Sequence, residues 1–162
     1  MLTIEKKSLK VGKYVSTAHV DSVIRTYKQE RWAHNSERIG KEDSLSVWYS
    51  IEELEEFMAT SKENGADGIK FYFAAYPESY TEKPGFAGRQ TLVLVATKTK
   101  ELETGVANKD IYIQSGEGAK ILAYNAGNIC PPLCNPKPTD ADDWGNIGVT
   151  IVDRGEEGLT VI

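Results

Sequence analysis

Residues 46–76 read SVWYSIEELEEFMATSKENGADGIKFYFAAY, and they contain a helix and a strand with clear signals at their boundaries. Ser50 is followed three residues later by Glu53, which is the pattern of a capping box, so we expect a helix to begin at about Ile51. Apolar residues then recur at helical spacing, and Gly65 is the expected end of the helix. Residues 69–76 alternate between two sets of side chains, which is the period of a strand.

A second strand is expected at residues 91–97, TLVLVAT, because this run is apolar on both faces. Such a pattern is typical of a central strand that is covered on both sides, or on one side with a partner beneath it. The connection between the two strands, residues 77–89, is longer than a hairpin normally needs. It contains aromatic residues among Pro and Gly, so it is a candidate functional loop, with a variable surface loop as the alternative.

The remaining elements are less sharply marked. Residues 17–33 have the spacing of a helix capped by Ser16 or Thr17, and residues 35–44 are polar and are expected to form a loop. Further predictions are strands at 110–114 and 120–124 joined by 115–119, an irregular Pro/Asn-rich loop segment at 126–146, and a last hairpin from 147–152 and 159–162.

These elements together predict an α+β fold, with a mainly antiparallel or mixed sheet of roughly five to seven strands and two helices packed on it. One alternative is that the helix at 51–64 is a right-handed crossover between parallel strands at 46–49 and 69–76. A length of 162 residues fits one domain spanning 1–162.

The net charge of −5 is unevenly distributed along the chain. Residues 1–45 carry nine Lys or Arg against six Asp or Glu, whereas residues 101–162 carry four against ten. A basic start and an acidic end would support contact between copies or docking to a basic partner, but an ordinary solvated surface is the preferred interpretation. The chain has no dense basic stripe, so we expect no nucleic-acid partner.

The sequence also bears on the compartment. Residues 1–7 lack the apolar region of a secretory signal, and no apolar run approaches the length of a membrane span. Two cysteines without a signal suggest reduced thiols. We therefore expect a cytoplasmic protein that makes no contact with a membrane.

Those two cysteines lie in the run Cys130-Pro131-Pro132-Leu133-Cys134. Extended backbone at the prolines would separate the two Cα atoms by about 12 Å, whereas a disulfide needs them within about 7 Å. A bridge therefore requires a sharp bend at Leu133 or a cis proline. Packed, inert thiols are the preferred interpretation, and a thiol-based redox or catalytic pair or a metal site are the alternatives.

A metal site has few other ligands to draw on. The only histidines are His19 and His34, about a hundred residues earlier in the chain. Asp140 and Asp142 match two positions of a calcium-binding EF-hand loop, but Ile151 stands where the bidentate carboxylate is required. Cys130, Cys134, Asp140 and Asp142 are thus weak metal candidates, and no cofactor is expected.

Five residues are candidates for a binding patch for a protein or a small ligand, and ordinary loop packing would suit them equally well. They are Tyr76, Tyr80, Phe86, Arg89 and Trp144. No nucleophile elbow or other catalytic set is present in the sequence.

The expected function is therefore a non-catalytic binding or interaction protein, with a protein partner or self-association. An acidic accessory or immunity-type partner of a basic protein is its concrete form. The alternatives are a thiol-based redox or catalytic protein using Cys130 and Cys134, and a metal- or small-ligand-binding module.

Overall fold

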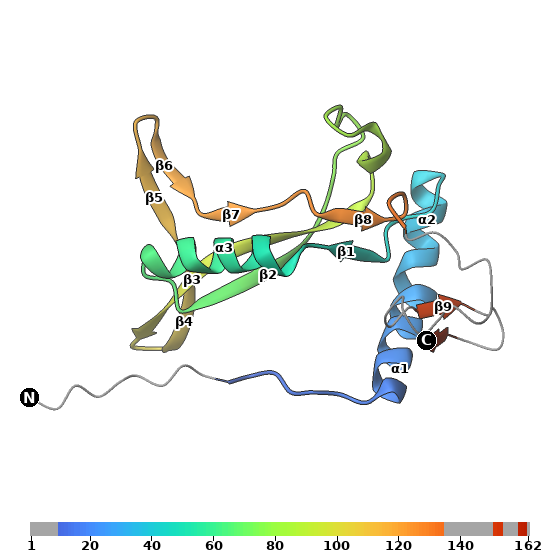
Figure 1. Cartoon of the computed structure of the whole chain (residues 1–162), viewed down its shortest axis with the longest axis horizontal. Coiled ribbons are helices and arrows are strands. Elements are labelled where there is room, and N and C mark those ends of the chain that lie inside the picture. Colours follow the sequence, from blue (N-terminus) through green and yellow to red (C-terminus); the bar gives the residue numbers. More distant parts are fainter. Residues whose placement is uncertain (1–9, 135–150, 154–158, 162) are drawn as a thin grey trace, which may run out of the picture. The chain divides into compact units, whose positions relative to one another are not determined.

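A computed structural model describes residues 10–134, 151–153 and 159–161 (Figure 1). The chain divides into two compact units, residues 1–42 with 134–162 and residues 43–133. Helices stand beside antiparallel strands, so the α+β class is confirmed. The single domain expected from the chain length stays a prediction.

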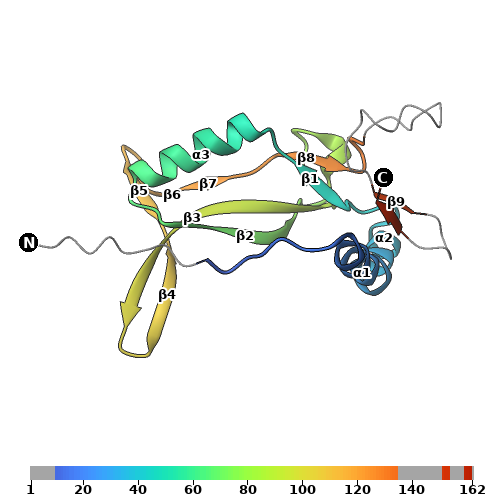
Figure 2. The same cartoon turned by 60° about the horizontal axis from the view of Figure 1, so that its bottom comes forward.

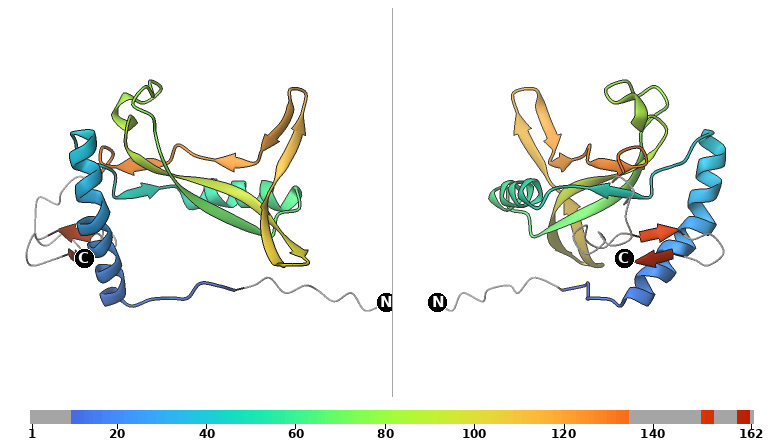
Figure 3. Two further views of the ribbon diagram at one scale, coloured as in Figure 1. Left: turned by 180° about the vertical axis from the view of Figure 1, so that it is seen from behind. Right: turned by 45° about the vertical axis from the view of Figure 1, so that its right-hand side comes forward.

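The first unit is built on a long helical segment. It consists of α1 (Thr17–Tyr27), a π-helical turn (Lys28–Trp32) and α2 (Ala33–Ile39), which follow one another as a single rod (Figure 3). The Ser16 side chain accepts a hydrogen bond from the His19 amide at 3.2 Å, which confirms the expected N-cap.

The expected loop at 35–44 is wrong in its first half, because the helix continues to Ile39. Gly40, with a φ of 70°, ends the helix in the left-handed conformation that glycine adopts easily. In the same unit, β9 (Ile151–Asp153) and β10 (Leu159–Val161) form the antiparallel hairpin expected near the end of the sequence. β10 lies beside α1.

The second unit is built around β3. The other strands of this unit are β1 (Ser46–Trp48), β2 (Gly68–Ala75), β4 (Gly105–Asp110), β5 (Tyr112–Ser115), β6 (Gly118–Ile121), β7 (Ala123–Tyr124) and β8 (Asn128–Cys130). β3 (Gln90–Leu102) pairs antiparallel with β2 on one edge and with β4 and β7 on the other. The expectation that residues 91–97 form a central strand is therefore confirmed.

Several expectations about connectivity need correction. The parallel crossover is wrong, because β1 pairs antiparallel with β8 and β2 pairs antiparallel with β3. β4 was not expected, and the turn between β5 and β6 has two residues because Ser115 lies opposite Gly118. β8 gives regular structure to part of segment 126–146, and residues 135–146 lie outside the described part of the chain.

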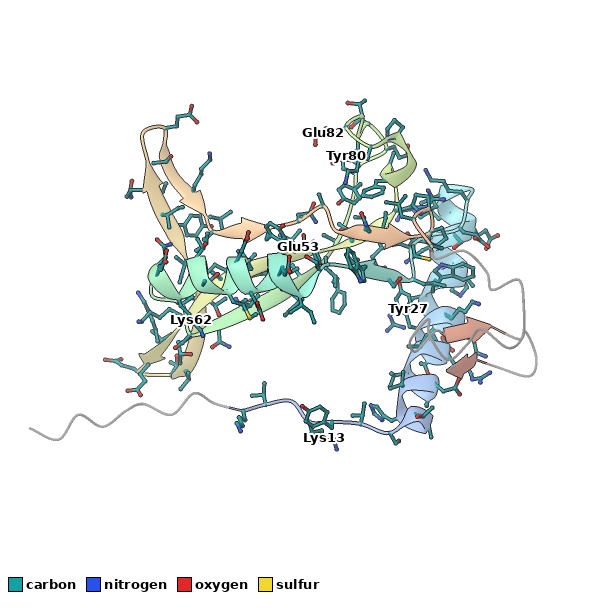
Figure 4. The ribbon with its side chains drawn as sticks, viewed as in Figure 1. Lys13, Tyr27, Glu53, Lys62, Tyr80 and Glu82 are labelled. Carbon is teal, nitrogen blue, oxygen red and sulfur yellow. The ribbon has the colours of Figure 1, made fainter. Side chains whose placement is uncertain are left out.

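The helix α3 (Ile51–Glu63) begins where its capping box predicts. The Ser50 amide donates to Glu53 Oε2 at 2.7 Å, and the Glu53 amide donates to Ser50 Oγ at 3.1 Å. The helix covers one face of the sheet (Figure 2), where Phe57 packs in a core cluster with Leu94, Ala96 and Leu122. The same Glu53, at the start of α3 (Figure 4), accepts a hydrogen bond from the Tyr124 hydroxyl at 2.8 Å.

Gly127, in the β7–β8 connection, lies close against the side chains of residues that precede α3. A Cβ at this position would lie 2.6 Å from Cζ of Tyr49 and 2.7 Å from Cγ1 of Val47. Contacts this short do not occur in folded proteins, so the position requires glycine for steric reasons. The Tyr49 side chain is half-buried beside Gly127, and this burial is the main cause that raises the pKa of its hydroxyl.

We expect Gly127→Ala to lower the free energy of unfolding by about 1–3 kcal/mol, the usual cost of overpacking a core. Gly116→Ala is the matched control, because a Cβ at Gly116 meets no atom within 4 Å. Denaturant unfolding of both variants and the wild type measures the difference. Equal stability of the two variants would contradict this account of the packing around Tyr49.

Candidate functional site

The outer edge of β2 is the candidate site. Within residues 43–133, no strand pairs with this edge. The Tyr76 amide donates to the Arg89 carbonyl at 2.9 Å, and the β2–β3 register continues without interruption from Ala75 to Gly68. Because hydrogen-bonding groups alternate in direction along a strand, the amides and carbonyls of Lys70, Tyr72 and Ala74 point toward β3.

The amides and carbonyls of Ile69, Phe71 and Phe73 consequently point away from β3, toward the outer edge. The side chains of this set are also exposed in part: Phe71 is 57% and Phe73 84% exposed. Both lie opposite leucines of β3, on the face that α3 covers. Since α3 packs over β3, the rings on the outer strand stay in solvent. The edge therefore combines unpaired backbone groups with exposed aromatic rings.

The other face of β2 carries a polar cluster. Lys70 Nζ lies 2.9 Å from Asp110 Oδ1, and the Tyr72 hydroxyl donates to Asp110 Oδ2 at 2.7 Å. The hydrogen bond to Asp110 is the main cause that raises the pKa of Lys70, and the bond from Lys70 is the main cause that lowers the pKa of Asp110. Both groups are held in their charged forms. A nucleophilic lysine needs a lowered pKa, so Lys70 is unsuited to that role.

The structure brings four of the five predicted binding residues together at the 77–89 loop. Ring centroids of Tyr76 and Tyr80 are 4.6 Å apart, and those of Tyr76 and Phe86 are 5.5 Å apart. Tyr76 and Phe86 are only 7% and 2% exposed and form a small core with Ile129. These rings hold the loop against the sheet. Trp144 lies outside the described residues.

The polar side chains at this loop form hydrogen bonds with nearby residues. The Tyr76 hydroxyl donates to Asn125 Oδ1 at 3.2 Å, and the Arg89 guanidinium donates to the carbonyl of Gly85. Tyr80 and Glu82 lie near the tip of the loop (Figure 4), where the Tyr80 hydroxyl donates to Glu82 Oε2 at 3.3 Å. Partial burial is the main cause that raises the pKa of the Tyr80 hydroxyl, and the nearby Glu82 carboxylate raises it further. A binding role for Tyr80 and Arg89 stays a prediction.

The cysteines depart from the expectation of reduced thiols. Cys130 and Cys134 are both disulfide-bonded, and they are the only two cysteines of the chain. The Cys130-Pro131 and Pro131-Pro132 peptide bonds are cis, which is one of the two routes to a bridge that the sequence allowed. In this form neither sulfur can act as a thiolate nucleophile or metal ligand.

The metal alternative has little geometric support in the part of the chain that the structure describes. No group of three or more His, Cys, Asp or Glu side chains is placed there to hold an ion. His19 lies in α1 and His34 in α2. Asp140 and Asp142 lie outside the described residues.

Comparisons with known proteins do not assign the chain. No family model, curated protein or solved structure matches it. None of the helices in the described residues is long and apolar enough to cross a bilayer.

Nothing in the local sequence pattern marks Phe71 and Phe73 as functional candidates. Their alternation with Lys70 and Tyr72 identified a strand, and an apolar alternation normally marks the buried face. Their exposure follows from the position of β2 at the edge of the sheet, which depends on the pairing of distant segments.

The polar cluster of Lys70, Tyr72 and Asp110 predicts a specific pH dependence of the free energy of unfolding. Because folding lowers the pKa of Asp110 below its ordinary 3.8, its stabilising contribution is present above that value and is lost as the pH falls through the lower folded pKa. We expect Asp110→Asn to reduce the gain in unfolding free energy between acid and neutral pH. Thermal unfolding over this range measures it. Glu117→Gln, at the exposed β5–β6 turn, is the control, and an equal change in both variants would refute the role of the cluster.

Proposed function

We propose that this chain is a non-catalytic interaction protein that accepts an extended segment of a partner protein on the outer edge of β2. One observation carries the proposal: the outward amides of Ile69, Phe71 and Phe73 lie on a strand whose phenylalanine rings are exposed. In strand addition, backbone hydrogen bonds supply affinity, and alternate side chains supply specificity.

The composition of β2 supports this role. Proteins normally protect an exposed edge strand from pairing by means of a short length, proline or charged side chains. β2 extends over eight residues without proline. Its one charged residue is Lys70, whose charge is balanced by Asp110 at 2.9 Å. The edge of β2 therefore lacks the usual obstacles to a partner strand.

The opposite outer strand of this sheet differs. β4 is shorter, begins with Gly105, and carries Asn108 and Lys109 among its six residues. Lysine on an edge strand discourages pairing, and glycine and asparagine are poor strand formers. The comparison favours β2 over β4 as the surface for a partner.

The net charge of residues 43–133 bears on which kind of partner would bind. Residues 43–133 carry eight Lys or Arg against thirteen Asp or Glu, so this unit is acidic. The net negative charge of this unit would attract a basic protein, as in an accessory or immunity-type pair, and self-association is the other expected kind of partner. A basic partner is a more specific proposal than strand addition alone.

Thiol chemistry and metal binding by the cysteines stay predictions, and both would require reduction of the Cys130–Cys134 disulfide. A cytoplasmic location is likewise a prediction. The disulfide removes one of its supports, because disulfides persist mainly in oxidising compartments.

Site-specific photo-crosslinking tests the proposal directly. A photoreactive residue in place of Phe73 should yield a discrete crosslinked protein species in the cells that make the chain. The same residue in place of Val106, which is 69% exposed on β4, is the matched control. Crosslinking at position 73 that is absent at 106, and that is lost with a second change Phe71→Ser, is the expected result. Equal products at 73 and 106, or none at 73, would overturn the proposal.

A further inference from the structure

We propose that the partner on the β2 edge is a second copy of this chain, with the two β2 strands antiparallel and related by a two-fold axis at Tyr72. This inference rests on the proposed function and names its partner. The reason is that β2 is complementary to itself in backbone and side chains, as a symmetric interface requires.

The backbone sets which residues can pair. Only Ile69, Phe71, Phe73 and Ala75 direct their amides and carbonyls outward, so hydrogen-bonded pairs across the axis join members of this set. An axis at Tyr72 places Phe71 opposite Phe73 of the second copy, and Ile69 opposite Ala75. Every outward amide and carbonyl from Ile69 to Ala75 then has a partner. Tyr72 lies opposite its own equivalent in a non-hydrogen-bonded pair.

The side chains fit the same register. Phe71 and Phe73, 57% and 84% exposed in the single chain, share one face of β2. In the pair they would meet the corresponding rings of the second copy on that face, and cross-strand aromatic pairs are stabilising. Lys70 would lie opposite Ala74, so the two lysines do not face each other across the axis.

The charge of the edge also permits self-pairing. Lys70 is the only charged side chain of β2, and Asp110 balances its charge within the same copy. The residual repulsion comes from the net charge of the whole acidic unit, which salt screens over about 8 Å at physiological ionic strength. Added salt should therefore strengthen the association of two copies. It should weaken the binding of a basic protein, so the salt dependence distinguishes the two kinds of partner.

Sedimentation of the purified full chain tests the second copy. We expect a concentration-dependent dimer that forms more readily at higher salt. Phe73→Lys should weaken it about tenfold or more, because two charges would enter an apolar contact. Val106→Lys, which also replaces an exposed apolar side chain with lysine but on β4, should leave it unchanged. Thermal unfolding of each variant at low concentration verifies that the fold is kept.

Cysteine crosslinking tests the register. Opposite residues of a non-hydrogen-bonded pair have Cα atoms about 4.5 Å apart, within the range of a disulfide. Mild oxidation should therefore crosslink Tyr72→Cys to itself, whereas Phe71→Cys should crosslink only when mixed with Phe73→Cys. Val106→Cys should stay monomeric. Self-crosslinking of Phe71→Cys without that of Tyr72→Cys would overturn the register.

The second copy and the strand addition are tested separately. A chain that is monomeric at every concentration and salt would overturn the inference of a second copy. If photo-crosslinking at position 73 then captured a different protein, the proposed strand addition would stand. A dimer that Phe73→Lys and Val106→Lys weaken equally would place the contact elsewhere and overturn the second copy on β2, whereas photo-crosslinking at position 73 still decides the proposed strand addition.

Discussion

The pairing of β3 along both of its edges is the constraint on which the larger unit depends. β2 occupies one edge from Gly68 to Ala75. On the other edge, the Ile111 amide donates to the Ala96 carbonyl at 2.9 Å, and the Ala96 amide donates to the Leu122 carbonyl at 3.0 Å. Leu94, Val95 and Ala96 are at most 2% exposed between these neighbours. Burial on both faces explains why this run of the sequence is apolar throughout.

The proposed site follows from that arrangement. Since β3 takes the centre, β2 must be an outer strand, and α3 packs above the central strand rather than the outer one. Phe71 and Phe73 therefore keep the strand alternation of a core face without the cover that a core face normally has. The Lys70–Asp110 pair then neutralises the one charge that would protect the edge. A partner strand would cover these rings and satisfy the outward backbone groups.

Local sequence signals predicted much of this unit. Ser50 and Glu53 fixed the start of α3, Gly65 follows the end of that helix, and the alternation at 69–76 identified β2. These features depend on interactions within a few residues. The exposure of Phe73, the burial of Tyr76 and Phe86, and the departure of the β5–β6 hairpin from the sheet depend instead on pairing between distant segments. Aromatic residues in a Pro- and Gly-containing loop have the same composition whether they pack inward or face a partner, so sequence alone could not separate these outcomes.

Residue-resolved amide hydrogen exchange across β2 is the most direct test of the open edge. In dilute protein, the amides of Lys70, Tyr72 and Ala74 should exchange slowly, because they donate to β3, and those of Ile69, Phe71 and Phe73 should exchange rapidly. Slow exchange that alternates residue by residue along the strand is the predicted result. Uniformly slow exchange in dilute protein would show that the outer edge of β2 is already covered within a single chain, and uniformly rapid exchange would show that β2 is not held by β3.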